Sequence, residues 1–427
     1  MQVAHQLVDE CNQHDWQWVR HLTQLRTSGC GEITQRLCML YASMFLALLP
    51  LLAVAQSPQP GPFPGKIAAD VRCAKVVSQG YALYLPSNYS PDRAWPLLLA
   101  FDPRARGLTA VERFAPAAER YGWIIAGSNN SRNGSGQSSV QSLQAMSDDI
   151  FAHYPVESKR IYAGGMSGGA RVAMGFAMTT GSFAGVIAAS AGFPDSRTPK
   201  SVPFPIFGTA GNEDFNWSEM SELDQTLTSP HRVVVFEGGH VWLSSDIATE
   251  AVEWLELHAM RTGIRAKDPA LIARLFADRT QKAEKLQGKL AWEAIRNIGL
   301  DFDGLHEQAA SFKDRAKQMA KEKAVQTEIK HDRQELAKEQ SATRDIWRNE
   351  QALANPQSHD TSLASLRDQL TLLTRQAESA SDSVDRRIAR RVTRGVISRG
   401  NRDLEYQKLL DKLRLSKTTA ALKLVAS

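Results

Sequence analysis

The chain has 427 residues, of which 43% are hydrophobic, and a formal net charge of +5. This length predicts two or three domains, and the hydrophobic fraction is ample for a packed core, which excludes a wholly disordered chain. The positive excess lies from residue 263 onward, with about 32 Lys and Arg against about 23 Asp and Glu. Because the signs alternate and no aromatic residues interrupt a basic run, we expect a solvated helical surface and no nucleic-acid partner.

Residues 1–55 have the features of a leader. Residues 39–55 form an apolar run that follows a basic residue and ends in Ala-Val-Ala, as in a secretory signal peptide cleaved after Ala55. Translation could also begin at Met39. The alternative is an uncleaved membrane anchor, but the run is short for a membrane span and Pro50 favours cleavage. We therefore expect a secreted or periplasmic protein.

Four cysteines occur, and three of them precede this cleavage point: Cys11, Cys30 and Cys38. The mature chain would keep only Cys73, which excludes an internal disulfide framework. No cysteine pair has metal-ligand spacing with histidines, so the sequence predicts no metal site.

The middle of the chain alternates strand-like and helix-like segments. A Pro/Gly-rich linker at 56–66 precedes this part, which spans residues 67–262, and residues 129–139 predict a mobile Ser/Asn/Gly loop. The predicted strands are 68–77, 81–85, 96–101, 123–126, 160–163, 183–189, 204–207 and 232–236, and the predicted helices are 111–121, 140–154, 170–178, 220–227 and 246–260. The first two strands can form an antiparallel pair, and the continuous apolar run at 96–101 is typical of a strand buried on both faces. This order predicts an α/β fold with a mostly parallel, doubly wound sheet.

Residues 263–427 predict a separate all-α C-terminal region, because helix-forming residues dominate and only two prolines interrupt them. The predicted helices are 270–286, 289–298, 305–355, 362–398 and 403–424. Leu305, Phe312 and Met319 recur every seven residues, which indicates pairing with another helix, although the repeat fades and falls short of a coiled coil. The expected role of this region is packing or binding of a protein partner.

The segment between the predicted strand 160–163 and the next predicted helix contains Gly-x-Ser-x-Gly, with Ser167 at its centre. Strand, tight turn and helix are the context of a nucleophile elbow, in which the serine hydroxyl is exposed at a strained turn. Gly165 and Gly169 would let the strand and the helix approach closely. Ser167 is therefore the candidate nucleophile, which needs a base and a group that orients the base.

The acid and the base are expected to follow Ser167 in that order, each just after a strand. Asp214 lies after the next-to-last predicted strand and is the candidate acid, with Glu213 as the alternative. His240 lies in a Gly-flanked loop after the last predicted strand and is the candidate base. His231 precedes that strand and His258 lies in a predicted helix, so both fit less well.

The residues that would bind the substrate are inferred from the same order. The backbone N–H of Gly168 is the expected first oxyanion donor, and the second should come from the loop after strand 96–101. Pro103 has no N–H, so Arg104 or Ala105 would donate. Three aromatic residues beside the acid and the base are candidates for lining the pocket, or equally for core and rim positions: Phe215, Trp217 and Trp242.

These motifs together resemble the α/β-hydrolase superfamily, and within it secreted esterases similar to polyhydroxybutyrate depolymerases, feruloyl esterases and dienelactone-hydrolase-like proteins. The matching residues are Gly-Gly-Met-Ser-Gly-Gly around Ser167, Gly-x-x-Asp at 211–214 and Gly-Gly-His-x-Trp at 238–242. The resemblance covers residues 81–260 and implies a Ser-His-Asp hydrolase that acts on small-molecule or polymeric esters without a cofactor. Members often carry His-Gly where this chain has Asp102 and proline, which bears on the second oxyanion donor.

Two other functions remain open beside a serine esterase. Serine peptidases of the prolyl-oligopeptidase type share the fold and the triad order, but they usually carry an additional β-propeller that the sequence does not indicate. The third possibility is a non-catalytic scaffold whose helical half binds a partner. Labelling of Ser167 by a fluorophosphonate separates the scaffold from the enzymes, and ester against amide turnover separates the two enzymes.

Overall fold

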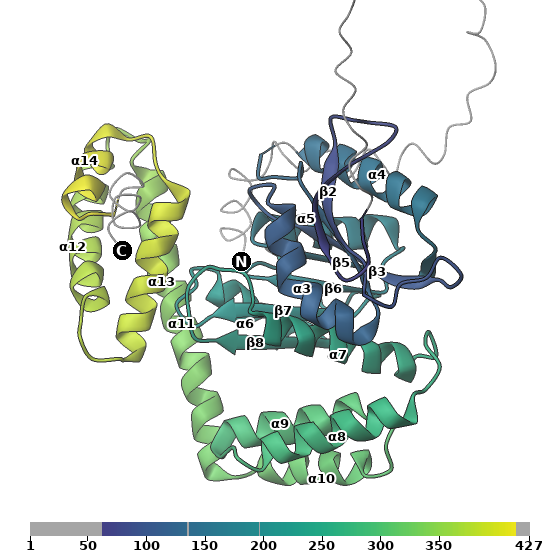
Figure 1. Cartoon of the computed structure of the whole chain (residues 1–427). Coiled ribbons are helices and arrows are strands. Elements are labelled where there is room, and N and C mark those ends of the chain that lie inside the picture. Colours follow the sequence, from purple (N-terminus) through teal and green to yellow (C-terminus); the bar gives the residue numbers. More distant parts are fainter. Residues whose placement is uncertain (1–61, 135, 196, 416–427) are drawn as a thin grey trace, which may run out of the picture.

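The computed structural model describes residues 62–134, 136–195 and 197–415. The predicted signal peptide therefore lies outside the described residues. An eight-stranded sheet with the order β1-β2-β4-β3-β5-β6-β7-β8 forms the centre of one part of the molecule, and the C-terminal helices lie below this part and to its left in the view of Figure 1. In the part of the chain that the structure describes, none of the helices is long and apolar enough to cross a membrane.

The sheet begins antiparallel and continues parallel. Its strands are β1 (Ile67–Arg72), β2 (Gly80–Tyr84), β3 (Trp95–Phe101), β4 (Ile124–Ser128), β5 (Val156–Met166), β6 (Gly185–Ala189), β7 (Ile206–Gly211) and β8 (His231–Phe236). Strand β2 pairs antiparallel with both β1 and β4, whereas every other pairing is parallel. The predicted initial antiparallel pair and the mostly parallel sheet are confirmed.

Helices cover both faces of the sheet. Helices α4 (Gly136–His153), α5 (Gly168–Thr180) and α6 (Trp217–Thr226) pack on one face, and α3 (Gly107–Tyr121) and α7 (Ser245–Arg261) pack on the other. The position of β3 explains why its sequence is apolar throughout. Leu97 and Leu99 belong to the core on the face that α4, α5 and α6 cover, and Leu98 belongs to the core on the opposite face. Alternate side chains of a strand point to opposite faces, so a strand covered on both faces has no polar side.

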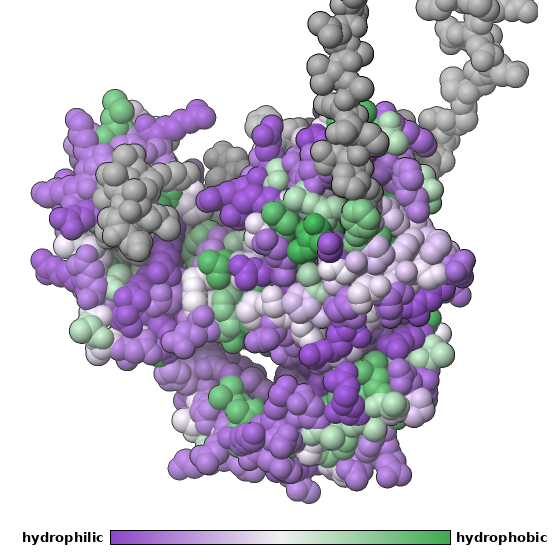
Figure 2. Space-filling view, viewed as in Figure 1, coloured by the Kyte–Doolittle hydropathy of each residue, from purple (hydrophilic) through white to green (hydrophobic). Residues whose placement is uncertain are grey.

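The helical region contains more helices than the sequence predicts. They are α8 (Pro269–Ala283), α9 (Gly288–Asp301), α10 (Ala309–Met319), α11 (Lys323–Ala352), α12 (His359–Ala377), α13 (Val384–Arg399) and α14 (Leu404–Lys412). Helices α8 to α10 lie below α7, and the long helix α11 leads from them to a bundle of α12 to α14 (Figure 1). The visible surface of this region is mainly hydrophilic (Figure 2), as expected from its alternating charges.

Two predicted long helices are wrong because each is broken in the structure. The segment 362–398, predicted as one helix, is divided into α12 and α13. The Ser383 side chain accepts a hydrogen bond from the Arg386 N–H and caps the start of α13. The predicted helix 305–355 is divided into α10 and α11. Phe312 and Met319 of α10 pack against the core of α8 and α9, so the seven-residue repeat reflects packing within the chain. Tertiary packing overrides helix propensity here.

The helical region is docked on the sheet domain at two places. At the first, Leu257 and Met260 of α7 share a core with α8 to α10. Beside them the buried Asp301 carboxylate accepts hydrogen bonds from Arg232 at 2.7 Å and from the indole N–H of Trp254 at 3.0 Å. At the second, α13 contacts the loop after β7 and α11 contacts α6.

Candidate active site

Ser167 occupies a strained turn between β5 and α5. Its φ of 54° and ψ of −123° lie in a backbone region that residues other than glycine rarely adopt. Its N–H donates a hydrogen bond to the Ala189 carbonyl at 2.8 Å. A Cβ at Gly165 would lie 2.2 Å from the Gly169 carbonyl oxygen, and one at Gly169 would lie 2.0 Å from that of Phe101. Both glycines are therefore required by the close approach of strand and helix.

Ser167, His240 and Asp214 form a continuous hydrogen-bonded chain. The Ser167 Oγ lies 2.8 Å from His240 Nε2, and His240 Nδ1 lies 2.8 Å from Asp214 Oδ1. Asp214 is fully buried and also accepts a hydrogen bond from the Asn216 N–H at 2.8 Å. The three side chains follow β5, β8 and β7, whose carboxyl ends share one edge of the sheet, where ligands bind in open α/β sheets.

The alternative acid and histidines of the sequence lie outside this chain of hydrogen bonds. Glu213 forms ion pairs with Arg390 and Arg394 of α13. His231 contacts backbone carbonyls at the start of β8. His258 stacks against Trp254 on α7, and its burial lowers its pKa to about 4.

Asp102 lies directly after β3 and connects the loop after β3 to the loop that carries His240 and Trp242. Its buried carboxylate accepts hydrogen bonds from the Arg104 N–H and the Trp242 indole, both at 2.8 Å, and from the Arg106 guanidinium at 3.0 Å. Burial alone would raise the pKa of Asp102, but the hydrogen bonds from Arg106, Trp242 and Arg104 outweigh it and lower that pKa.

The prediction that Arg104 supplies the second oxyanion donor is wrong. Its N–H is already bonded to the Asp102 side chain, and the N–H of Ala105 donates to the Asp102 carbonyl at 3.1 Å. The reason is the buried carboxylate of Asp102, which takes up the nearest N–H groups.

Asn133 is a residue that the sequence did not single out. Its side chain lies against Gly168, such that a Cβ at Gly168 would be 1.7 Å from Asn133 Oδ1. Its amide makes no hydrogen bond to any described residue, and it lines the space beside Ser167. The only sequence clue was its place in the loop rich in Ser, Asn and Gly.

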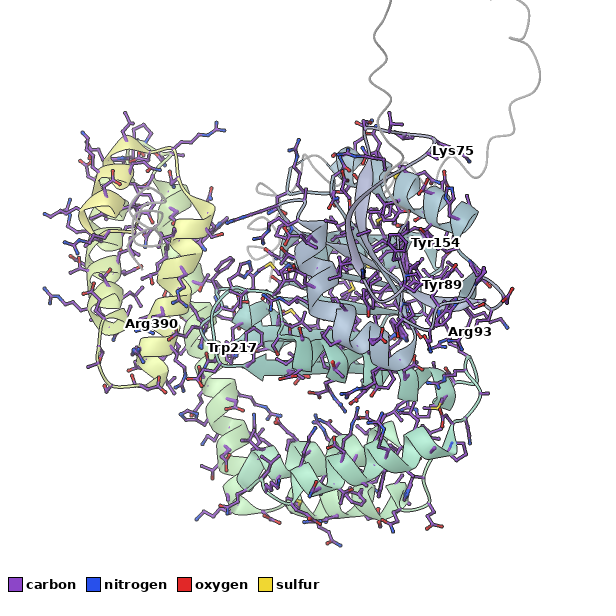
Figure 3. All side chains as sticks on the ribbon, viewed as in Figure 1. Lys75, Tyr89, Arg93, Tyr154, Trp217 and Arg390 are labelled. Atoms are coloured by element: carbon purple, nitrogen blue, oxygen red, sulfur yellow. The ribbon has the colours of Figure 1, made fainter. Side chains whose placement is uncertain are left out.

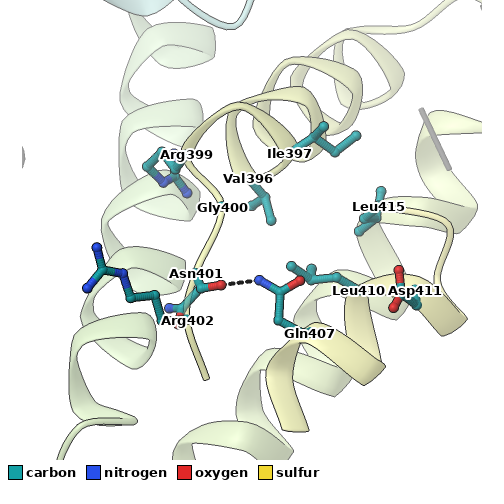
Figure 4. A pocket seen from close by; sticks show the side chains of 10 residues that line it. All are labelled: Val396, Ile397, Arg399, Gly400, Asn401, Arg402, Gln407, Leu410, Asp411 and Leu415. Carbon is teal, nitrogen blue, oxygen red and sulfur yellow. Dashed lines mark hydrogen bonds between the residues drawn. The ribbon is translucent and has the colours of Figure 1, made fainter. Parts of the chain in front are cut away.

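Two cavities meet at Ser167. The larger, of about 730 Å³, lies beside His240, and the smaller, of about 520 Å³, lies beside Gly168. Ser398, near the end of α13, lines both, so the helical region forms one wall of the site. A third cavity of about 450 Å³ lies between α13 and α14 (Figure 4), and Ser167 is not among the residues that line it.

The three aromatic candidates occupy different places. Phe215 lines both cavities, and its ring stacks on His240 with a centroid separation of 4.0 Å. Trp242 lines the larger cavity while its indole N–H is bound to Asp102. Trp217 lines neither cavity, and the Arg391 guanidinium lies 4.1 Å above its ring. Figure 3 shows Trp217 on the side of the sheet domain that faces the helical bundle. Trp217 packs against the core of the sheet domain, which is the alternative that the sequence left open for it.

Helix α13 holds the loop that carries Asp214. The Arg391 guanidinium donates to the Asn212 carbonyl at 2.6 Å, and Arg394 donates to the Glu213 carbonyl at 2.7 Å. Arg391 is itself buried and bound by Glu335 and Glu339 of α11. These contacts join residues more than 170 positions apart, so no local sequence pattern could reveal them.

The Glu335–Arg391–Glu339 cluster predicts a pH dependence of stability. Burial, with Glu335 as a like-charged neighbour, raises the pKa of Glu339 to about 7 despite the hydrogen bonds from Arg391. Between about pH 4.5 and pH 7 the folded protein thus holds a proton that the unfolded chain has released, so the free energy of unfolding falls as the pH rises through this range. Urea unfolding of wild type and Glu339→Gln should show this decline only in wild type, and an identical slope in both would contradict it.

Comparisons with known proteins give similarity at the level of solved structures. No family model and no curated protein matches the chain. A thermostable esterase has 16% identity over 44% of this chain and 61% of its own length, with a TM-score of 0.34. Est1E from Butyrivibrio proteoclasticus has 13% identity over 45% of this chain and all of its own length, with a TM-score of 0.36. A puromycin-hydrolysing peptidase of Mycobacterium tuberculosis has 10% identity over 43% of this chain and 37% of its own length, with a TM-score of 0.34.

The strand order and the serine turn after β5 decide the fold class. The fold is that of an α/β hydrolase, followed by a helical C-terminal region. The predicted fold class is confirmed.

Proposed function

We propose that the protein is a serine hydrolase that cleaves carboxylic esters through an acyl-enzyme intermediate. The observation that carries this proposal is the pair of 2.8 Å contacts from Ser167 to His240 and from His240 to Asp214. A serine hydroxyl needs a base within hydrogen-bond reach, and a base needs an oriented tautomer. The buried Asp214 carboxylate would accept a hydrogen bond from the Nδ1–H of His240 and leave Nε2 free to take the serine proton.

The proposed reaction has two steps. Ser167 Oγ attacks the ester carbonyl while its proton passes to His240 Nε2, and the tetrahedral intermediate collapses when the bond to the alcohol breaks and His240 returns the proton to the leaving oxygen. Water then attacks the acyl-serine with His240 as base, releasing the acid and restoring Ser167. No cofactor takes part in either step.

Asn133 is part of the proposal as the second oxyanion donor, beside the N–H of Gly168. Amide orientation follows from hydrogen bonding, and no hydrogen bond to a described residue fixes the side-chain amide of Asn133, so its NH₂ group can turn toward the developing oxyanion. Asn133→Ala should lower kcat for p-nitrophenyl acetate roughly 100-fold with little change in KM. Asn133→Asp, of equal size but without a donor, should be as impaired. Wild-type kcat in either variant would remove Asn133 from the mechanism.

The proposal is tested by labelling. A fluorophosphonate probe should attach to Ser167, as identified by mass spectrometry, because only an activated serine reacts rapidly with it. Matched p-nitrophenyl esters and p-nitroanilides separate an esterase from a peptidase. A folded protein that takes no label and turns over neither class would be a scaffold instead.

Export is a further part of the proposal, supported by the apolar run at 39–55 and its Ala-Val-Ala ending. Cleavage after Ala55 would make Gln56 the first residue of the mature protein. N-terminal sequencing of the exported protein reads this directly, and a retained leader would indicate a membrane anchor.

A further inference from the structure

The larger of the two cavities at Ser167 is basic. Arg104, Arg106 and Arg113 line it, and its lining contains no aspartate or glutamate within the residues that the structure describes. The Arg106 guanidinium is bound to Asp102 at 3.0 Å. The side chains of Arg104 and Arg113 have no hydrogen-bond or ion-pair partner among the described residues. Two unpaired positive charges therefore face this cavity.

The smaller cavity has a more balanced charge. Three arginines line it, but Arg171 pairs with Glu219 at 2.7 Å and Arg399 pairs with Glu350 at 3.4 Å. Glu219 itself also lines this cavity, which leaves one of its arginines, Arg132, without an acidic partner among the described residues. The larger cavity therefore has two unpaired arginines, and the smaller cavity has one.

Helix α3 adds to the positive potential of the larger cavity. The helix begins at Gly107 with no side-chain cap, and Thr109 of its first turn lines the cavity together with Arg113 one turn later. The N-terminus of a helix carries a partial positive charge from its unpaired N–H groups. The helix start and the two free guanidinium groups act in the same direction.

Under the proposed mechanism, the larger cavity is also the one that would receive the leaving alcohol. His240 must give its proton to the alcohol oxygen, and His240, Val241 and Trp242 line the larger cavity, whereas none of them lines the smaller one. The alcohol portion of an ester bound at Ser167 therefore extends toward Arg104 and Arg113.

Building on the proposed esterase function, we propose that the substrate is an ester whose alcohol portion carries an anionic oxygen group, held by Arg104 and Arg113. The planar guanidinium fork matches the oxygens of a carboxylate or a phosphate, and hydrogen bonds between opposite charges are stronger than neutral ones. A positive cleft also raises the local concentration of an anionic ester. The two side chains are specificity-determining residues for the alcohol portion.

The test compares two esters of nearly the same shape. 4-Acetoxybenzoate carries a carboxylate in its leaving group, and 4-acetoxybenzamide is its neutral counterpart. The ratio of their kcat/KM values, divided by the ratio of their hydroxide-catalysed rates, reports charge selectivity alone. Wild type should prefer the anionic ester by about tenfold at low salt, and this preference should shrink at about 0.5 M salt because exposed charges are screened.

Variants assign the selectivity to the two arginines. Arg104→Gln/Arg113→Gln should lower the selectivity ratio about fivefold. Arg367→Gln, an exposed arginine on α12 without an ion pair among the described residues, should leave the ratio unchanged. Thermal unfolding of each variant checks that it is folded. A ratio near one in wild type, or an unchanged ratio in the double variant, would overturn the proposal.

Three further arms locate the charge and separate this proposal from the proposed function. 4-Hydroxybenzoate and 4-hydroxyphenyl phosphate are each tested as competitive inhibitors of ester hydrolysis. Their inhibition constants show whether the carboxylate or the phosphate binds more tightly. p-Nitrophenyl hemiglutarate carries its charge in the acyl part. If wild type prefers it to a neutral ester but does not prefer 4-acetoxybenzoate to 4-acetoxybenzamide, the placement of the anionic group in the alcohol portion is contradicted. Ser167-dependent hydrolysis of p-nitrophenyl acetate without charge selectivity would defeat this inference alone, whereas no ester hydrolysis at all would defeat the esterase function.

Discussion

Ser167→Ala is expected to lower kcat for p-nitrophenyl acetate about 10⁵-fold, to near the background rate. The variant removes the atom that would bond to the acyl group, and His240 and Asp214 then have no nucleophile to activate. The members of such a triad act as a unit, so loss of the serine costs nearly as much as loss of all three. Because the Ser167 side chain is small and only partly buried, the variant should fold as wild type does.

Two comparisons make this result decisive. Ser182→Ala removes an exposed hydroxyl just beyond α5, which among the described residues is bonded only to Thr180, and should retain full activity. Hydrolysis of p-nitrophenyl acetate, butyrate and octanoate by wild type would also reveal the size of the acyl site. A folded Ser167→Ala that keeps more than about 1% of the wild-type kcat would place the nucleophile elsewhere.

Arg391→Ala is expected to have the second-largest effect, destabilising the protein by about 3–5 kcal/mol. The guanidinium is 1% exposed and lies between Glu335 and Glu339, so its removal leaves two carboxyl groups buried without their partner. The change also removes the hydrogen bond to the Asn212 carbonyl, two residues before Asp214. We therefore expect a kcat about 10- to 100-fold lower in the molecules that remain folded, because small displacements of a catalytic group are costly.

A second variant separates stability from positioning. Arg391→Met combined with Glu335→Leu and Glu339→Leu replaces the buried charges by apolar side chains and should recover most of the lost free energy of unfolding. Its kcat should stay low, since nothing then holds the Asn212 carbonyl. Full recovery of kcat would show that α13 does not position the acid loop.

The matched control lies on the same helix. Arg387→Gln removes one ion pair within the described part of the chain, with Asp382, and this partner is mostly exposed. Its free energy of unfolding in urea and its kcat should both remain close to wild type, within about 0.5 kcal/mol for stability. A loss as large as that of Arg391→Ala would mean that any change on α13 disturbs the site.

The sequence predicted much of the sheet and the candidate triad because both depend on local patterns. Apolar runs such as the one in β3 mark strands that are covered on both faces, and the glycines around Ser167 mark a turn that tolerates no side chain. The order of acid and histidine after the serine follows from successive strand ends. The helix boundaries within 305–355 and 362–398 were missed, because helix propensity is nearly uniform there and packing decides where a helix stops.

The sequence by itself determined the α/β framework and the positions of Ser167, Asp214 and His240 along it. Only the tertiary structure decided what surrounds them: Asp102 engages the Arg104 N–H and a tryptophan 140 positions away, and α13 closes one side of the site. The physical reason is the distance along the chain over which each kind of interaction acts. Turns, strands and caps depend on neighbouring residues, whereas a hydrogen-bond partner, a wall of a cavity or an unpaired charge depends on which distant segments the folded chain brings together.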